Sequence, residues 1–189
     1  MRVKIYSDLH LEFKREPLPY EANQGEELVI LADDISTGTQ GVSWAMKTFP
    51  HVPVVYVLGN HEFYSHNFEA LVGECKALAH GSNVHVLEND AVEIGDVRVL
   101  GCTLWTNFCI CGQEAQQDCM RWAQQYMSDF LAIRDSGSAL RPGKTVEWFR
   151  SSVKWLSNQI STAKKPLIVV TPDGHPKCAS RGHLNLYQR

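Results

Sequence analysis

The sequence has no apolar run long enough to cross a membrane, and it begins with strand-forming residues where a signal peptide would have an apolar core. It also carries little net charge, since 18 Lys and Arg against 21 Asp and Glu give −3 at pH 7. Such a balance argues against broad electrostatic binding to nucleic acid or to anionic membranes. We therefore expect a cytoplasmic protein with neither a membrane nor a nucleic acid as its partner.

Paired cysteines of the Cys-x-x-Cys form, which are typical of a zinc ribbon, are missing. Three of the six cysteines (Cys109, Cys111 and Cys119) lie close enough together to raise the alternative of a thiolate site. Their spacing matches no metal motif, and the chain is large for a disulfide scaffold. We therefore expect reduced thiols in a core and a loop.

Internal repeats and low-complexity segments are absent as well, and 189 residues with 44% hydrophobic content fit one domain. Apolar, β-branched runs predict strands at 2–7, 27–32 and 53–58. Helical spacing predicts helices near 42–49, where Pro50 follows, and from Phe68 to His80-Gly81. This alternating order predicts a largely parallel sheet with functional loops at the carboxyl ends of its strands.

The second half of the chain predicts shorter strands and longer helices. The expected elements are strands near 84–87, 91–94 and 97–102, a helix near 113–134, a loop at 136–143, a helix from about Thr145 to 165 and a buried strand at 167–171. Gly95-Asp96 predicts a hairpin turn, and prolines keep the polar loop around 16–19 from being helical. We expect one domain over 1–171 and an irregular tail over 172–189, which lacks a hydrophobic period.

Apolar stripes give the two later helices their expected buried faces. The first stripe comprises Ala115, Cys119, Trp122, Ala123, Tyr126, Met127 and Phe130, and the second Val146, Phe149, Val153, Leu156 and Ile160. Because Trp122, Trp148 and Trp155 fall in these helices, we expect them to serve helix packing. Trp105 follows a strand, and the alternative that it flanks a site stays open.

Three polar segments follow the first three predicted strands: Asp8-Leu9-His10, Asp33-Asp34-Ile35 and Gly59-Asn60-His61-Glu62. Carboxylate, imidazole and amide ligands together suit Mn, Fe or Zn better than Ca or Mg. A carboxylate of the Asp pair can bridge two cations. Each segment alone fits a solvated turn at a strand end, but three in this order are improbable as coincidence.

With these segments the chain resembles the calcineurin-like metallophosphoesterases, whose motifs run D-x-H, G-D-x, G-N-H-[ED], a His-bearing segment and a final G-H-x-H. The stretch 100–106 (Leu-Gly-Cys-Thr-Leu-Trp-Thr) is similar to the corresponding strand and loop of bacterial members. The resemblance implies an α/β fold of the four-layer αββα sandwich type. It also implies hydrolysis of a phosphorylated small molecule or a phosphodiester at a dinuclear centre of Mn, Fe or Zn.

Residue by residue, the resemblance implies that Asp8 and His10 bind the first metal, that Asp34 bridges, and that Asn60 binds the second. His61 would act as general acid or would stabilise charge on the phosphoryl group. Asp33 stands where the family has glycine. Either carboxylate could therefore bridge, and the place of Asp34 before Ile35 favours Asp34.

The family's Thr-His-His and G-H-x-H segments have no counterpart after 167–171. His175 and His183 follow glycines but match no family position. Our hypothesis is a shortened member, a frameshift or truncation product near residue 171, with part of the second sheet missing. Such a chain is expected to hold one metal weakly and to have low phosphatase activity. The alternative is a non-catalytic metal- or phosphate-binding remnant, and the oligomeric state stays open.

Overall fold

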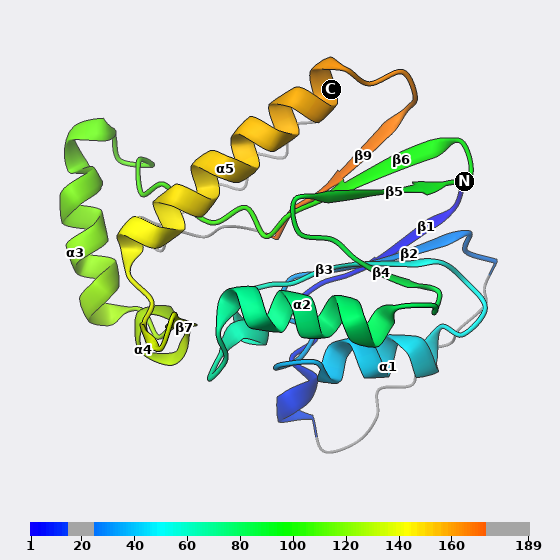
Figure 1. The fold of residues 1–189 in the computed structure, drawn as a ribbon, viewed down its shortest axis with the longest axis horizontal. Helices are drawn as coiled ribbons and strands as arrows, with labels where there is room; N and C mark the ends of the chain where they lie inside the picture. The colour runs from blue at the N-terminus through cyan, green and yellow to red at the C-terminus, as the bar shows by residue number, and fades with distance from the viewer. Residues whose placement is uncertain (15–24, 173–189) are drawn as a thin grey trace.

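Two β-sheets lie face to face between helices in the computed structural model, which describes residues 1–14 and 25–172 (Figure 1). The predicted loop around 16–19 and all of the predicted tail except Pro172 lie outside the described residues. No helix within the described ranges is both long enough and apolar enough to span a bilayer. The α/β class predicted from the sequence is confirmed.

The first sheet is fully parallel and has the strand order β1-β2-β3-β4. Its strands are β1 (Val3–Tyr6), β2 (Leu28–Ala32), β3 (Val54–Val57) and β4 (Val84–Val86). Every residue of β2 and β3 is buried, as expected for central parallel strands covered on both faces. The three predicted strands of the first half therefore lie side by side, with their carboxyl ends at one edge.

Two helices, α1 (Gln40–Thr48) and α2 (Phe68–Ala79), cover the outer face of this sheet (Figure 1). Buried side chains of α1 and α2 pack against Leu31 and Tyr56 of the strands. The Asn67 side chain caps α2 by accepting a hydrogen bond from the Ala70 amide (3.1 Å). Both helices fall where their apolar spacing predicts them.

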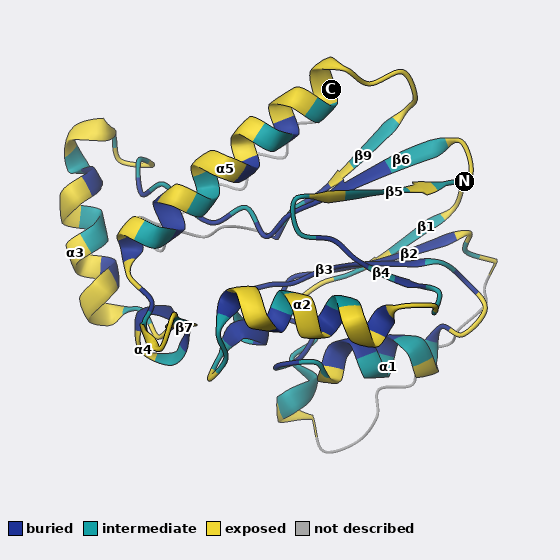
Figure 2. Cartoon of the chain, viewed as in Figure 1, coloured by how far each residue is buried: buried dark blue, intermediate teal, exposed yellow. Residues whose placement is uncertain are grey.

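The second sheet has three strands in the order β5-β6-β9. These are β5 (Asp90–Ile94), β6 (Val97–Gly101) and β9 (Leu167–Val170). β5 and β6 form an antiparallel hairpin around Gly95 (φ 58°), and β9 runs parallel to β6. The long helix α5 (Pro142–Ser161) packs on the outer face through Leu156, so the layers run helices, sheet, sheet, helix (Figures 1 and 2).

The prediction of one helix over 113–134 is wrong. The segment divides into a 3-10 turn (Gln113–Ala115), α3 (Gln116–Tyr126) and α4 (Asp129–Ala132). Met127 interrupts the helix because its backbone is extended (ψ 132°). The chain therefore changes direction beside the ends of the first sheet's strands, where α4 brings Asp129 to the site described below.

Two further expectations for this region need correction. The loop predicted at 136–143 is partly ordered. β8 (Ser138–Ala139) lies in it and pairs with β7 (Arg134–Asp135), which comes just before it, and α5 starts at Pro142, a residue suited to the first helical turn. The predicted inner face of α5 is partly wrong, because Val153 and Ile160 are 38% and 51% exposed. The helix turns Thr145 and Ser152 inward.

The inner face of β1 is the exposed part of the sheet-to-sheet interface. Ile5 and Ile30 are partners in the parallel register and so point to the same side of the sheet. Ile30 is 3% exposed and packs with Val99 of the second sheet, whereas Ile5 is 65% exposed. The second sheet thus covers β2 and β3, whereas on β1 it leaves Ile5 exposed and Val3 only partly buried.

This difference predicts unequal effects of the same substitution on neighbouring strands. Ile30→Ala should lower the free energy of unfolding by about 2–5 kcal/mol, because it removes buried methyl groups and leaves a cavity. Its matched control, Ile5→Ala, should change it by less than about 1 kcal/mol. Urea unfolding followed by circular dichroism measures both values, and equal losses would show that β1 is covered after all.

Candidate metal centre

Three loops meet where β1, β2 and β3 end, as the sequence predicts. The first loop carries Asp8-Leu9-His10, the second Asp33-Asp34-Ile35 and the third Gly59-Asn60-His61-Glu62. The amide of Asp8 donates to the carbonyl of Asp33 (3.0 Å), and the amide of His10 donates to the carbonyl of Asp34 (2.9 Å). The first loop therefore runs alongside the second after the strands have ended. As a result, ligand atoms of Asp8, His10 and Asp34 all lie within 4.8 Å of one another.

The backbone at this junction is unusual, because four non-glycine residues have left-handed conformations. Their φ angles are +53° for Asp8, +46° for His10, +70° for Asp33 and +47° for Asp34. Such conformations are uncommon, cost roughly 1–3 kcal/mol each, and cluster at functional sites. Asp33 keeps the left-handed conformation that glycine adopts most easily, so its presence there does not change the path of the loop.

A buried carboxylate, that of Glu62, joins the second and third loops. Its Oε1 accepts hydrogen bonds from the amides of Ile35 (2.9 Å) and Ser36 (3.2 Å) and from the hydroxyl of Tyr56 (2.8 Å). Its Oε2 accepts from the amide of Gly59 (2.9 Å). Burial raises the pKa of Glu62 to about 7, although the donated hydrogen bonds oppose that shift.

Gly59 leaves room for the two acidic side chains. A Cβ atom at this position would overlap the carboxylates of Asp33 and Asp34 and the amide nitrogen of Asp34. The third loop can therefore pack directly against the second only because it has no side chain here. This contact explains the glycine of the third motif.

The geometry favours Asp34 over Asp33 as the metal ligand. Asp34 Oδ1 accepts a hydrogen bond from the amide of His61 (2.9 Å), and its carboxylate belongs to the candidate group with Asp8 and His10. Burial raises the pKa of Asp33 to about 8, and the negative charges of Asp34 and Asp8 add to the shift. A bound cation relieves this kind of like-charge repulsion, so the donor set fits a divalent metal.

Asn60 is held by two groups that the sequence analysis did not identify. Its Nδ2 donates to Asp129 Oδ1 (2.7 Å), and the Tyr64 hydroxyl donates to the same oxygen (2.8 Å). With the amide nitrogen engaged, the amide oxygen of Asn60 is left as the ligand atom. Burial and the charge of Asp129 raise the pKa of Tyr64, which keeps that hydroxyl a donor.

His61 lies between a carboxylate and an aromatic ring. Its Nδ1 is 3.3 Å from Glu12 Oε1, and the same oxygen is 3.3 Å from Nδ1 of His10. Its Nε2 is 3.9 Å from Asp34 Oδ2, and its ring stacks on Tyr64 with centroids 4.5 Å apart. Glu12 was not predicted as a site residue. It follows His10, the last residue of the first motif, by two positions, and this spacing is the feature of the sequence that could have identified it.

A cavity of about 500 Å³ opens beside these groups. The predicted site residues Asp8, His10, Asp34, Asn60 and His61 all line it, together with residues of the loop after β6 and of α3 and α4. The open alternative for Trp105 is supported, because Trp105 lines the cavity while remaining 9% exposed.

The helix-packing expectation holds for Trp148, which stacks on Phe68 with centroids 4.0 Å apart. It is wrong for Trp122, which is 42% exposed and lines the cavity. The five described cysteines (Cys75, Cys102, Cys109, Cys111 and Cys119) are free thiols, as predicted. Neither candidate metal-binding group in the described residues includes one of them.

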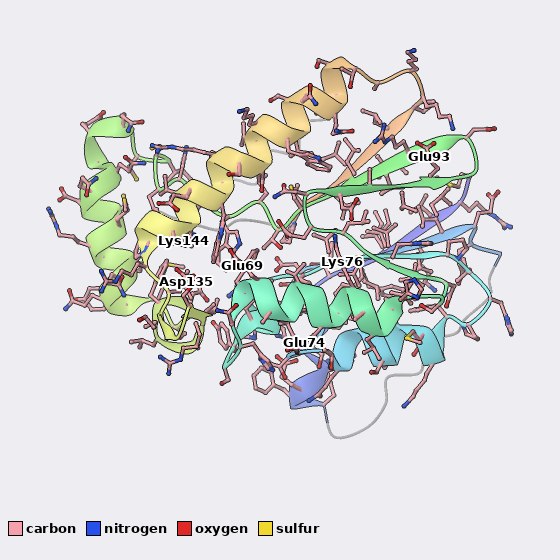
Figure 3. All side chains as sticks on the ribbon, in the orientation of Figure 1. Glu69, Glu74, Lys76, Glu93, Asp135 and Lys144 are labelled. Atoms are coloured by element: carbon pink, nitrogen blue, oxygen red, sulfur yellow. The ribbon has the colours of Figure 1, made fainter. Side chains whose placement is uncertain are left out.

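Replacing Glu62 by glutamine tests whether its carboxylate holds the loops after β2 and β3 together. In glutamine an NH₂ donor replaces one of the two carboxylate oxygens that accept from backbone N–H groups. Two donors would then face each other, so Glu62→Gln should lower the free energy of unfolding by roughly 1–3 kcal/mol. Glu74→Gln on the exposed side of α2, labelled in Figure 3, is the matched control and should leave stability unchanged. Chemical denaturation at pH 8, where Glu62 is ionised, gives both values, and equal stability of the two variants would contradict this role.

Comparison with known proteins gives a distant viral relative. No protein-family model matches the chain. The chain is 24% identical over 200 residues to an uncharacterized protein of Acanthamoeba polyphaga mimivirus, a match that covers 90% of this chain and 67% of that protein. The name of that protein states no function, so the similarity assigns none to this chain.

Proposed function

We propose that this chain is a metal-dependent hydrolase of phosphate mono- or diesters with the fold of a calcineurin-like metallophosphoesterase. The observation that carries the proposal is the convergence of Asp8, His10 and Asp34 at the ends of neighbouring parallel strands. The order of layers, with two facing sheets between helices, supports the αββα sandwich that the resemblance implies.

The donor set suggests how cations would be held. Asp8, His10 and Asp34 would bind one cation, and Asp34 with the amide oxygen of Asn60 would reach toward a second. When bound, divalent cations such as Mn, Fe or Zn supply Lewis acidity that neutralises phosphate charge and favours ionisation of water. Carboxylate and imidazole donors suit these metals, and the like charge around Asp33 favours their binding.

His61 would donate a proton to the leaving oxygen of the substrate. Glu12 accepts at Nδ1, which orients the ring and leaves Nε2 as the reacting nitrogen on the side of Asp34. Stacking on Tyr64 restrains the ring further. A general acid positioned in this way contributes roughly 10²–10⁴-fold to the rate.

A second candidate function is a non-catalytic module that binds one metal or a phosphate group. It is favoured by the way the ligands are shared within the described residues. Asp8, His10 and Asp34 form one compact group, and His10, Glu12 and His61 form another. Because both groups need His10, they favour one bound cation over two. The stoichiometry of Mn²⁺ separates the functions, because two ions per chain support the hydrolase and one or none supports the module.

Two substitutions should separate metal binding from proton transfer. His61→Asn should lower turnover of bis-p-nitrophenyl phosphate by roughly 10²–10⁴-fold while Mn²⁺ affinity stays near wild type. Asp34→Asn should abolish tight Mn²⁺ binding, and removal of metal with EDTA should abolish turnover. Titration calorimetry and a colorimetric assay measure the two properties.

The control for His61→Asn is His51→Asn, which changes an exposed histidine outside the cavity lining. It should keep both properties. The hydrolase proposal fails if the metal-loaded wild type shows no turnover above His61→Asn, or if turnover persists without metal.

A further inference from the structure

An exposed aromatic pair lines the same cavity as the candidate metal centre. Trp122 and Tyr126 of α3 are 42% and 62% exposed, and their ring centroids lie 5.4 Å apart. Because they are four residues apart on a helix, they share one stripe of its surface. Both line the cavity that Asp8 and Asp34 line.

This pair does not contribute to the hydrophobic core. The buried residues of α3 are Gln116 and Ala123, and the helix adds the partly buried Cys119 and Met120 to the core. Trp122 and Tyr126 thus present ring surface to solvent inside a cavity. Aromatic surface exposed in a concave site is typical of ligand binding, because stacking there removes apolar area from water.

The charge of the cavity limits what can bind against these rings. Its lining includes the carboxylates of Asp8, Asp33, Asp34 and Asp129, and no Lys or Arg among the described residues that form it. A ligand with several phosphates, or a nucleic-acid strand, would find no guanidinium or ammonium partner there. A small ester with one phosphate and an uncharged planar group suits a cavity that is lined by both carboxylates and exposed rings.

We propose that Trp122 and Tyr126 form a stacking surface for a planar group, a nucleobase or an aryl ring, that is part of the alcohol or phenol released from a small phosphate ester. This inference rests on the proposed function, since it assumes that the phosphate lies beside the carboxylates. The rings line the same cavity as the carboxylates, so one small ester would contact both. Stacking of this kind tolerates different planar groups, because every such group has a π-face.

Binding of an uncharged nucleoside to the metal-free protein tests the surface without any need for catalysis or for a phosphate beside the carboxylates. Saturation-transfer NMR with adenosine should show transfer to the base protons, and ribose should show far weaker transfer. Trp122→Ala and Tyr126→Ala should each weaken adenosine binding by roughly 5- to 100-fold, and Trp122→Phe should retain most of it. Ile160→Ala, an exposed change on α5 outside the cavity lining, is the matched control and should have no effect.

Hydrolysis of adenosine 5′-monophosphate and ribose 5-phosphate by the Mn²⁺-loaded protein provides the second measurement, because the two esters share the same kind of ester bond and differ in the base. Trp122→Ala should lower kcat/KM for the nucleotide by roughly 5- to 100-fold and change that for ribose 5-phosphate less than about twofold. If neither ester is hydrolysed but Trp122→Ala still loses adenosine binding, the stacking surface stands and the hydrolase proposal falls. If the wild type binds no adenosine, or the variants bind it equally well, the inference is overturned whatever the hydrolysis result.

Discussion

Glu62 provides the constraint on which the candidate site depends, because its buried carboxylate accepts hydrogen bonds from the loops after both β2 and β3. These hydrogen bonds join the loop that carries Asp34, whose backbone is left-handed, to the loop that carries Asn60. Gly59 lets them approach, and the amide of His61 then bonds to the Asp34 carboxylate. The fold therefore sets the arrangement of the candidate metal ligands.

Two kinds of side chain line the cavity, and in our proposal each would contact a different part of the ligand. The first kind is the carboxylates. Burial raises the pKa of Asp33, the charges of Asp34 and Asp8 raise it further, and a divalent cation would relieve this repulsion. The second kind is the exposed rings of Trp122 and Tyr126. A phosphate ester with a planar group would place its charge beside the carboxylates and its apolar surface against the rings.

Much of this arrangement could be predicted from short-range patterns in the sequence. The parallel strands, the bounds of α2 and the placement of Asp8, His10, Asp34, Asn60 and His61 at strand ends follow from local periodicity and the rule for parallel sheets. The break at Met127 could not be predicted, because the apolar stripe continues through it. Nor could the contact of Asn60 with Asp129, which lies 69 residues further along the chain and is set by tertiary packing. The solvent exposure of Trp122 and Val153 depends on which neighbours cover each helix, and helical periodicity does not reveal that.

We propose a cation site at the ends of β1, β2 and β3, and anomalous diffraction from crystals soaked in Mn²⁺ can locate it. We expect an anomalous peak in contact with the side chains of Asp8, His10 and Asp34. A saturating soak that leaves these side chains ordered and shows no peak between them would rule this site out.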